Sequence, residues 1–329
     1  MEPKDFEIYQ TSSHCSLYEV GGENDYFTFI SSTPETRKIM NDPTVVGVEY
    51  TSLLQQACVA TLKAFSKHSG FKLHEDETLV LNILRGGLNF ELRDALCEAY
   101  SWNTHGSWFV SSQRVCDDEG KWSISEDSYK KVYFTPKSTI ILGDVAATGT
   151  TLKAILPSLI EEALEEDCQI RHLVLFTIGG SNAASVIEKI DKELSETFPK
   201  YEGSAVIYFE GIFNLAGSEN ELSIKENGTD LLRTKSVLSP EFLSSQYDEP
   251  SYPIERCVIY DAGARAFHVP EYVADVIDYW EQVLELAKNG IDFDEYLEER
   301  FPELDQDKFK YHSLKSIAKE QLKKLEGIV

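Results

Sequence analysis

Short apolar segments alternate with segments of helical periodicity between about residue 78 and residue 215, and this alternation constrains the fold more than any other feature of the chain. The apolar runs suit strands that are buried on both faces, and the periodic segments suit covering helices. The strand-like runs are Thr78–Leu84, Thr139–Leu142, Arg171–Ile178 and Ala205–Phe209, and the helical segments are Phe90–Tyr100, Thr150–Ala163 and Ala183–Leu194. We therefore predict an α/β fold with a mainly parallel sheet flanked by helices.

The N-terminal part of the chain departs from this alternation. Residues 1–50 are mixed and rich in turns, with strand-like pieces at Tyr26–Ile30 and Val45–Tyr50. Residues 51–67 carry apolar side chains at helical spacing behind a Thr-Ser start, which predicts a helix. We expect residues 1–50 to form an N-terminal segment, and we expect either this segment or the C-terminal addition to form a hood over the site.

The C-terminal part also differs from the alternating region. Residues 218–255 are polar and loop-like, Arg256–Tyr260 is an apolar strand candidate, and Glu271–Glu326 predicts two or three amphipathic helices. The expected organisation is an N-terminal segment at 1–50, one of the two candidates for the hood, a core domain at 51–217, and a mixed loop and helical extension at 218–329 that packs on the core.

Composition excludes some classes of function. The chain has 31 basic and 56 acidic residues and a net charge of −25, which argues against binding to nucleic acid or to anionic membranes. Its six cysteines show no metal-ligand spacing, as expected for reduced thiols. No signal peptide and no apolar run of membrane-spanning length is present. We expect a cytoplasmic protein without a direct metal site.

The segment STIILGDVAATGTTLKAIL, residues 138–156, carries the clearest chemical signal. An apolar strand ends at Asp144, a loop of small and hydroxyl-bearing residues follows, and a helix begins near Thr150. The helix start offers unpaired N–H groups, Ala147 and Gly149 allow close approach of the backbone, and the threonines add hydroxyl donors. The arrangement predicts an anion-binding loop at the carboxyl end of a strand, where ligands of parallel α/β sheets bind.

This segment resembles the 5-phosphoribosyl pyrophosphate (PRPP) motif of the type I phosphoribosyltransferases. The resemblance implies that Thr148, Gly149, Thr150 and Thr151 hold the 5-phosphate, with Ala147 in the same loop, and that Asp144 binds the ribose hydroxyls. It also implies Mg²⁺, which arrives with PRPP and which Asp144 could contact through water.

A second segment, LVLNILRGGL at residues 79–88, is similar to the pyrophosphate loop of the same family, most closely in its uracil branch. Arg85 would offer a guanidinium fork to the pyrophosphate oxygens. Gly86 and Gly87 would allow the close backbone approach that such a loop needs. The two motifs follow each other in the order that the family requires.

The polar stretch from Gln113 to Tyr129 lies between strand-like pieces at Ser107–Ser112 and Lys131–Phe134. It corresponds to the family's flexible loop, which closes over PRPP and excludes water. Arg114 and Lys121 are its candidate pyrophosphate-facing cations, although both also suit a solvated loop.

Two further segments, ETRKIMNDPT at 35–44 and YDAGARAF at 260–267, are similar to segments of the uracil branch. The second implies that Asp261, Gly263 and Arg265 approach the acceptor, although its distance along the chain from the phosphate loop is longer than the family pattern.

The phosphate-binding segment departs from the family pattern at two positions. Gly143 stands where many members carry a first acid, and Ala147 stands where purine-salvage members carry an aspartate.

The resemblance implies a glycosyltransferase of the pentosyltransferase type, commonly a homodimer, that moves the phosphoribosyl group of Mg²⁺–PRPP to a small nitrogenous base and releases pyrophosphate. A pyrimidine-like acceptor is favoured over a purine. Arg85, Arg114 and Asp144 would be the catalytic residues. The alternative is a non-catalytic protein on the same fold that senses PRPP or a nucleotide and acts on a partner through its helical tail.

Overall fold

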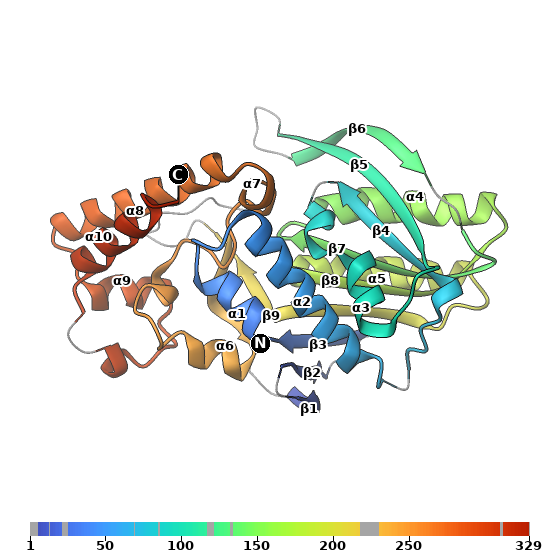
Figure 1. Cartoon of the computed structure of the whole chain (residues 1–329), viewed down its shortest axis with the longest axis horizontal. Coiled ribbons are helices and arrows are strands. Elements are labelled where there is room, and N and C mark those ends of the chain that lie inside the picture. The colour runs from blue at the N-terminus through green and yellow to red at the C-terminus, as the bar shows by residue number, and fades with distance from the viewer. Residues whose placement is uncertain are drawn as a thin grey trace.

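The structure is a computed structural model of the chain (Figure 1). It describes residues 6–12, 14–21, 26–68, 70–84, 86–116, 122–131, 134–217, 230–309 and 312–328. Within these residues the strands form one ten-stranded sheet. Its order is β1 (Phe6–Thr11), β2 (Ser16–Val20), β3 (Phe27–Ser32), β9 (Gly203–Leu215), β8 (Gln169–Gly180), β7 (Lys137–Ala146), β4 (Thr78–Leu84), β5 (Gly106–Cys116) and β6 (Trp122–Lys131), with β10 (Leu231–Leu238) paired to β9.

The centre of this sheet is parallel. Strands β3, β9, β8, β7, β4 and β5 run in the same direction, whereas β1, β2, β6 and β10 add antiparallel pairs at the margins. The predicted mainly parallel sheet is therefore confirmed. Strand β3 shows that the N-terminal segment contributes to the sheet itself.

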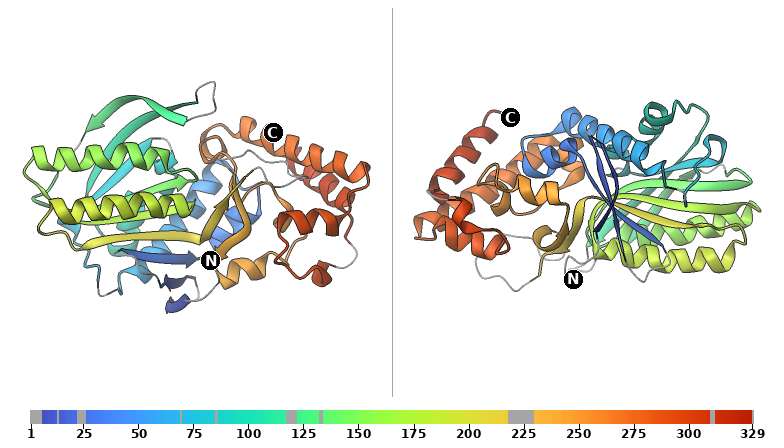
Figure 2. Two further views of the ribbon diagram at one scale, coloured as in Figure 1. Left: turned by 180° about the vertical axis from the view of Figure 1, so that it is seen from behind. Right: turned by 90° about the horizontal axis from the view of Figure 1, so that it is seen from below.

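Helices cover both faces of the sheet (Figure 2). Helices α2 (Gly47–Phe65) and α3 (Leu92–Tyr100) share one hydrophobic core with one face, and α4 (Thr150–Glu165) and α5 (Ser181–Thr197) share a second core with the other. The central strands are buried on both faces, which explains why they read as continuous apolar runs rather than alternating ones.

The C-terminal region has a third core of its own, beside the sheet in Figure 1. It contains α8 (Val269–Lys288), α9 (Phe293–Arg300) and α10 (Leu314–Leu325), which confirm the predicted amphipathic helices. The shorter helices α1 (Pro34–Asn41), α6 (Pro240–Ser245) and α7 (Ala262–Phe267) lie between this region and the sheet. No helix in the described part of the chain is long and apolar enough to cross a membrane.

Two strand predictions were wrong. Val45–Tyr50 leads into α2, whose first residue Gly47 has φ +57°, and the burial of Val45 and Tyr50 comes from helix packing rather than from a sheet. Arg256–Tyr260 is irregular. Its apolar members are buried in the core clusters, and Val258 N donates a hydrogen bond to Leu231 O.

Part of the flexible loop expected between residues 113 and 129 is strand, because β5 extends to Cys116 and β6 begins at Trp122. Strands β5 and β6 form a long antiparallel ribbon, with register from Phe109 opposite Lys131 to Cys116 opposite Trp122 (Figure 1). A two-stranded ribbon at the sheet margin is held by backbone hydrogen bonds and needs no continuous apolar run. The sequence signal for strands was therefore weak here.

Candidate functional site

The loop that follows β7 has the conformation expected of an anion cradle. Asp144 is 9% exposed near the end of β7, in register with Thr177 of β8. Gly149 is the N-cap of α4 and has φ +69°. Because glycine has no side chain, the N-cap itself offers no side-chain oxygen to the N–H groups at the start of this helix. A left-handed residue at this point favours glycine, and an added Cβ would lie 3.0 Å from Val186 Cγ2.

Hydrogen bonds within and around the loop fix its shape. The hydroxyls of Thr148 and Thr150 lie 2.8 Å apart, and Thr150 N donates to Thr148 Oγ1 at 3.3 Å. Asn182 Nδ2 donates to Ala147 O at 3.1 Å from the start of α5. Thr151, in the first turn of α4, is half-buried. The loop is thus held from within and from the neighbouring helix.

A cation lies beside the loop. Lys153 Nζ is 3.5 Å from Thr148 O, and the side chain is exposed. An ammonium group next to a helix N-terminus strengthens the attraction for a phosphate. The sequence analysis did not single out Lys153, although its place one turn inside the predicted helix was a usable signal.

The second motif meets the first at the base of this loop. Gly86 and Gly87 open the short 3-10 helix η2 (Gly86–Phe90), which follows β4. A Cβ at Gly86 would lie 3.6 Å from Asp144 Oδ1, and one at Gly87 would lie 2.9 Å from Gly143 O. Two segments about sixty residues apart in sequence therefore pack backbone to backbone, and the glycine at 87 permits it. Arg85 itself lies outside the described residues.

Gly143 has a steric reason for lacking a side chain. A Cβ at this position would lie 2.4 Å from Phe90 Cγ and 2.8 Å from Phe90 Cβ. Phe90 is fully buried, at 0% exposed, and stacks on Phe209 at 6.3 Å between ring centroids. The space that a first acid would need is thus filled by an aromatic ring.

The YDAGARAF segment reaches the same area through η2. Asn89 Nδ2 donates to Ala262 O at 3.0 Å. Asp261 is exposed and caps α7, accepting hydrogen bonds from Gly263 N at 2.8 Å and Ala264 N at 2.9 Å. Asp261 and Gly263 therefore lie close to the glycine loop, and their contact with an acceptor remains a prediction.

Arg265 has a different environment. The residue is 1% exposed, and its guanidinium donates to Val45 O at 2.7 Å and Asp42 O at 2.7 Å in the α1–α2 connection and to Ile39 O at 2.9 Å in the last turn of α1. The group also lies over the rings of Tyr50 and Tyr272. These contacts give Arg265 a structural role, and nothing in them directs it toward the loops.

The remaining predicted cations cannot be placed. The side chain of Arg114 and all of Lys121 lie outside the described residues, although the backbone of Arg114 is in β5, opposite Ile124 of β6. Asn89, Phe90 and Asn182 were missed by the sequence analysis. Asn182 had a signal, since it directly follows a buried strand at the carboxyl edge of the sheet.

The donor chemistry of the site suits a magnesium ion that arrives with its ligand. Among residues placed in the structure, no group of three His, Cys, Asp or Glu side chains could hold a metal ion. Asp144 and the threonine hydroxyls are hard oxygen donors of the kind that Mg²⁺ accepts, and a single carboxylate suits a contact through water.

Comparison with known proteins assigns no family to the chain. No protein-family model and no curated protein sequence matches the chain. Among solved structures, a hypoxanthine-guanine phosphoribosyltransferase from Bacillus anthracis aligns at 17% identity and a TM-score of 0.26, over 41% of this chain and 72% of that chain. A hypoxanthine phosphoribosyltransferase from Staphylococcus aureus aligns at 18% identity and a TM-score of 0.27, over 42% of this chain and 68% of that chain.

A ternary substrate complex of hypoxanthine phosphoribosyltransferase from Trypanosoma cruzi aligns at 13% identity and a TM-score of 0.24, over 60% of this chain and 95% of that chain. These are similarities to type I phosphoribosyltransferase structures at low identity and low TM-score. They leave the uracil branch as a prediction, and the function proposed below depends on the loops themselves.

Proposed function

We propose that this protein binds Mg²⁺–PRPP at the loop after β7 and transfers its phosphoribosyl group to a nitrogenous base. The observation that carries the proposal is the meeting of two separate motifs. The carboxylate of Asp144, the cradle at Thr148–Thr151 and the glycines at 86 and 87 share one edge of the sheet. An anion cradle, a carboxylate and a glycine loop are the parts needed for a phosphate, a ribose and a pyrophosphate.

Each part has a defined chemical role in this proposal. The α4 N-terminus and the hydroxyls of Thr148, Thr150 and Thr151 bind the 5-phosphate, while Ala147 and Gly149 keep the backbone close. Asp144 accepts hydrogen bonds from the ribose hydroxyls. Magnesium, when bound, neutralises charge on the pyrophosphate, and Arg85 and Arg114 would bind the same group.

The reaction is a substitution at the anomeric carbon. The bond from that carbon to the pyrophosphate oxygen breaks and the pyrophosphate leaves with the electron pair. A bond to the acceptor nitrogen forms, and that nitrogen gives up its proton. Rate acceleration would come from holding the two reactants together and from stabilising the leaving group, not from a protein nucleophile.

A pyrimidine-like acceptor is our proposal for the substrate class. Ala147 offers no carboxyl group to protonate a purine ring, and its carbonyl is occupied by Asn182. Asp261 and Gly263, next to η2, would contact the acceptor. The family resemblance further leads us to propose a homodimer that works in the cytoplasm.

One observation favours a second candidate. The ring of Phe90 leaves no room for an acidic side chain at position 143, so Asp144 would be the only carboxylate to bind the ribose. A site that binds PRPP but turns it over poorly would suit a PRPP- or nucleotide-sensing regulatory protein. Such a protein would act on a partner through the helical region from residue 269 onward.

The test is calorimetric titration of Mg²⁺–PRPP into the wild type, Asp144→Asn and Thr148→Ala. We expect the wild type to bind and each variant to lose about 1–3 kcal/mol, the cost of removing a hydrogen-bonding partner of a charged ligand. Thr135→Ala, a threonine in the segment before β7 at the opposite edge, is the matched control. Absence of binding by the wild type would refute the proposal.

Pyrophosphate release then separates the two candidates. Wild-type protein with Mg²⁺–PRPP is supplied with uracil, cytosine, orotate, hypoxanthine or adenine. Release with a pyrimidine supports the transferase and its preference. Binding without release from any of these bases supports the sensor.

A further inference from the structure

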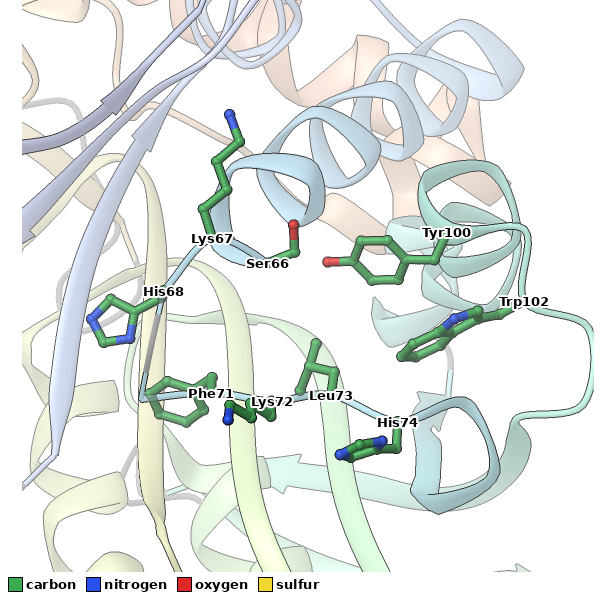
Figure 3. Close-up of a pocket in the computed structure, with 9 residues that line it drawn as sticks. All are labelled: Ser66, Lys67, His68, Phe71, Lys72, Leu73, His74, Tyr100 and Trp102. Carbon is green, nitrogen blue, oxygen red and sulfur yellow. The ribbon is translucent and has the colours of Figure 1, made fainter.

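A cavity of about 580 Å³ opens at the edge of the sheet opposite the two loops (Figure 3). Its walls come from residues 66–68 and 71–74, in the connection from α2 to β4, and from Tyr100 at the end of α3 and Trp102 in the connection from α3 to β5. Both connections lie at the amino ends of parallel strands, whereas Gly86 and Thr148 follow the carboxyl ends. The cavity is therefore separate from the proposed PRPP site, and its volume is in the range of small-molecule sites.

One wall of this cavity is aromatic and fixed. The rings of Tyr100 and Trp102 lie 4.9 Å apart between centroids, at 53° to each other, and Leu73 faces them across the opening (Figure 3). Tyr100 Oη donates to Leu62 O at 2.6 Å, which anchors its ring to the end of α2. Trp102 is half-buried and keeps part of its indole open to a ligand. A planar ring would find an apolar surface here.

The rim of the cavity is cationic. Lys67, Lys72 and His74 are exposed lining residues, and Ser66 adds a hydroxyl. None of the lining residues placed in the structure is acidic. Neither lysine forms an ion pair with any residue in the described ranges, unlike Lys38 with Glu49 at 2.6 Å. Two lysines and no acid therefore line one hollow in a chain of net charge −25.

No acid in the described residues pairs with Lys67 or Lys72. Asp76 is exposed, Glu19 lies 3.9 Å from His68, and two further acids bind other groups. Glu75 accepts hydrogen bonds from the backbone N–H groups of Asn103 and Thr104. Glu77 pairs with Arg171 at 3.0 Å. The two lysines are thus left available to an external anion.

From this combination we propose that the cavity is a nucleotide-binding site. The base would stack on Trp102 beside Tyr100, and the phosphate would be bound by Lys72 and Lys67, with His74 at the rim. Base–aromatic stacking and charge-assisted hydrogen bonds together select a ligand with both a planar ring and a negative charge. The site does not depend on the function proposed above, because it shares no residue with the PRPP loops.

The test is calorimetric titration with adenosine 5′-monophosphate, compared with adenosine alone and inorganic phosphate alone. Measurements are made on the Thr148→Ala protein, so that the phosphate loop of the other edge does not contribute. We expect the nucleotide to bind at least about tenfold more tightly than either fragment, since each fragment makes only half of the contacts.

Variants of the cavity complete the test. Trp102→Ala and Lys72→Ala should each weaken the nucleotide by about fivefold to a hundredfold. Lys189→Ala, an exposed lysine on α5 across the sheet, should leave the affinity unchanged although it alters the net charge equally. Lys72 is exposed, so its variant keeps the test valid even if Trp102→Ala unfolds. Equal affinity in Lys72→Ala and the parent, or phosphate binding as tight as the nucleotide, would overturn the site.

Discussion

At the scale of single residues, the candidate site depends on which side chains are missing as much as on which are present. Gly87 lets η2 approach β7 backbone to backbone, Gly149 adopts a left-handed conformation, and Gly143 makes room for a ring. Each glycine has a different neighbour that excludes a Cβ. The first prediction concerns Gly143, because it decides whether this site could carry a second acid.

Gly143→Ala should lower the free energy of unfolding by about 1–3 kcal/mol, the usual cost of overpacking a core. The new Cβ would lie 2.4 Å from Phe90 Cγ, and neither the β7 backbone nor the buried ring can move freely. Urea unfolding measures the loss. Gly217→Ala is the matched control, since a Cβ there meets nothing within 4 Å.

A second substitution tests the cause. In a double-mutant cycle, Gly143→Ala should cost much less in a Phe90→Ala background, because alanine lacks the Cγ atom that would lie 2.4 Å from the new Cβ. Additive effects of the two substitutions would show that the ring is not the obstacle. In that case the absence of a first acid would need another explanation.

The local parts of the site were predictable and their partners were not. The loop from Asp144 to Thr151 is continuous in sequence, so its strand, glycine and hydroxyls are visible as a pattern. The contact of Asn89 with Ala262 joins residues 173 positions apart. Nor does any local pattern show that Phe90 fills the space at Gly143. Long-range packing decides such contacts, and a single sequence does not encode them in its periodicity.

At the scale of elements, strands buried on both faces were predictable because their apolar runs are uninterrupted. Strand β4 was expected at Thr78–Leu84 and has those bounds. The strand pieces expected at Ser107–Ser112 and Lys131–Phe134 cover only part of the β5–β6 ribbon, because the rest of the ribbon is polar and has no apolar run. The strand prediction at Val45–Tyr50 was wrong because a short apolar run has no periodicity that distinguishes a strand from the buried start of a helix. In both segments, the contacts with the rest of the protein decided the secondary structure, and the segment's own residues did not predict it.

A buried carboxylate joins several of these elements. Glu210 of β9 is 0% exposed and has φ +62°. Its Oε1 accepts hydrogen bonds from Thr33 N at 2.9 Å and Thr36 Oγ1 at 2.5 Å at the start of α1, and its Oε2 accepts one from Ser239 Oγ at 2.8 Å at the start of α6. One side chain thus fixes two helix N-termini against the sheet.

Glu210→Ala should lower the free energy of unfolding by about 2–4 kcal/mol, because it leaves buried donors at both helix starts without partners. Glu210→Gln should cost less, since an amide keeps one acceptor oxygen. Glu196→Ala is the control, because Glu196 is an exposed residue of α5. Urea midpoints for the three proteins give the comparison.

The same residue predicts a pH dependence. Burial raises the pKa of Glu210 from its usual value of 4.5, so the folded protein holds this proton more tightly than the unfolded chain does. Its contribution to stability is therefore complete below about pH 4.5 and declines as the pH rises through the folded pKa. Stability of the Glu210→Gln protein should fall less steeply than that of the wild type from pH 5 upward. Parallel curves would contradict a shifted pKa.

At the scale of the whole molecule, the chain has two cores on the faces of the sheet and a third in the C-terminal region. The third core is tied to the rest through the connection between α1 and α2. Tyr272 Oη donates to Pro43 O at 3.1 Å, and Arg265 donates to two backbone oxygens of the same connection and to one at the end of α1. The sequence predicted the helices of this region but not how they attach.

The last prediction concerns Arg265, which attaches the C-terminal region to the rest of the protein. Arg265→Met should lower the free energy of unfolding by about 3–5 kcal/mol, because Ile39 O and Val45 O would lose their buried donor and Asp42 O would keep only the hydrogen bond from Val45 N. In a protein whose other three tryptophans are replaced by phenylalanine, the fluorescence of Trp280, which is 0% exposed inside the third core, should change at lower urea with Arg265→Met than without it. Arg93→Met is the control, since the Arg93 side chain is 72% exposed. If Arg265→Met instead keeps wild-type stability and loses only affinity for the acceptor base, Arg265 acts on the substrate, as the family resemblance implies, and the attachment must rest on Tyr272 and the helix packing around it.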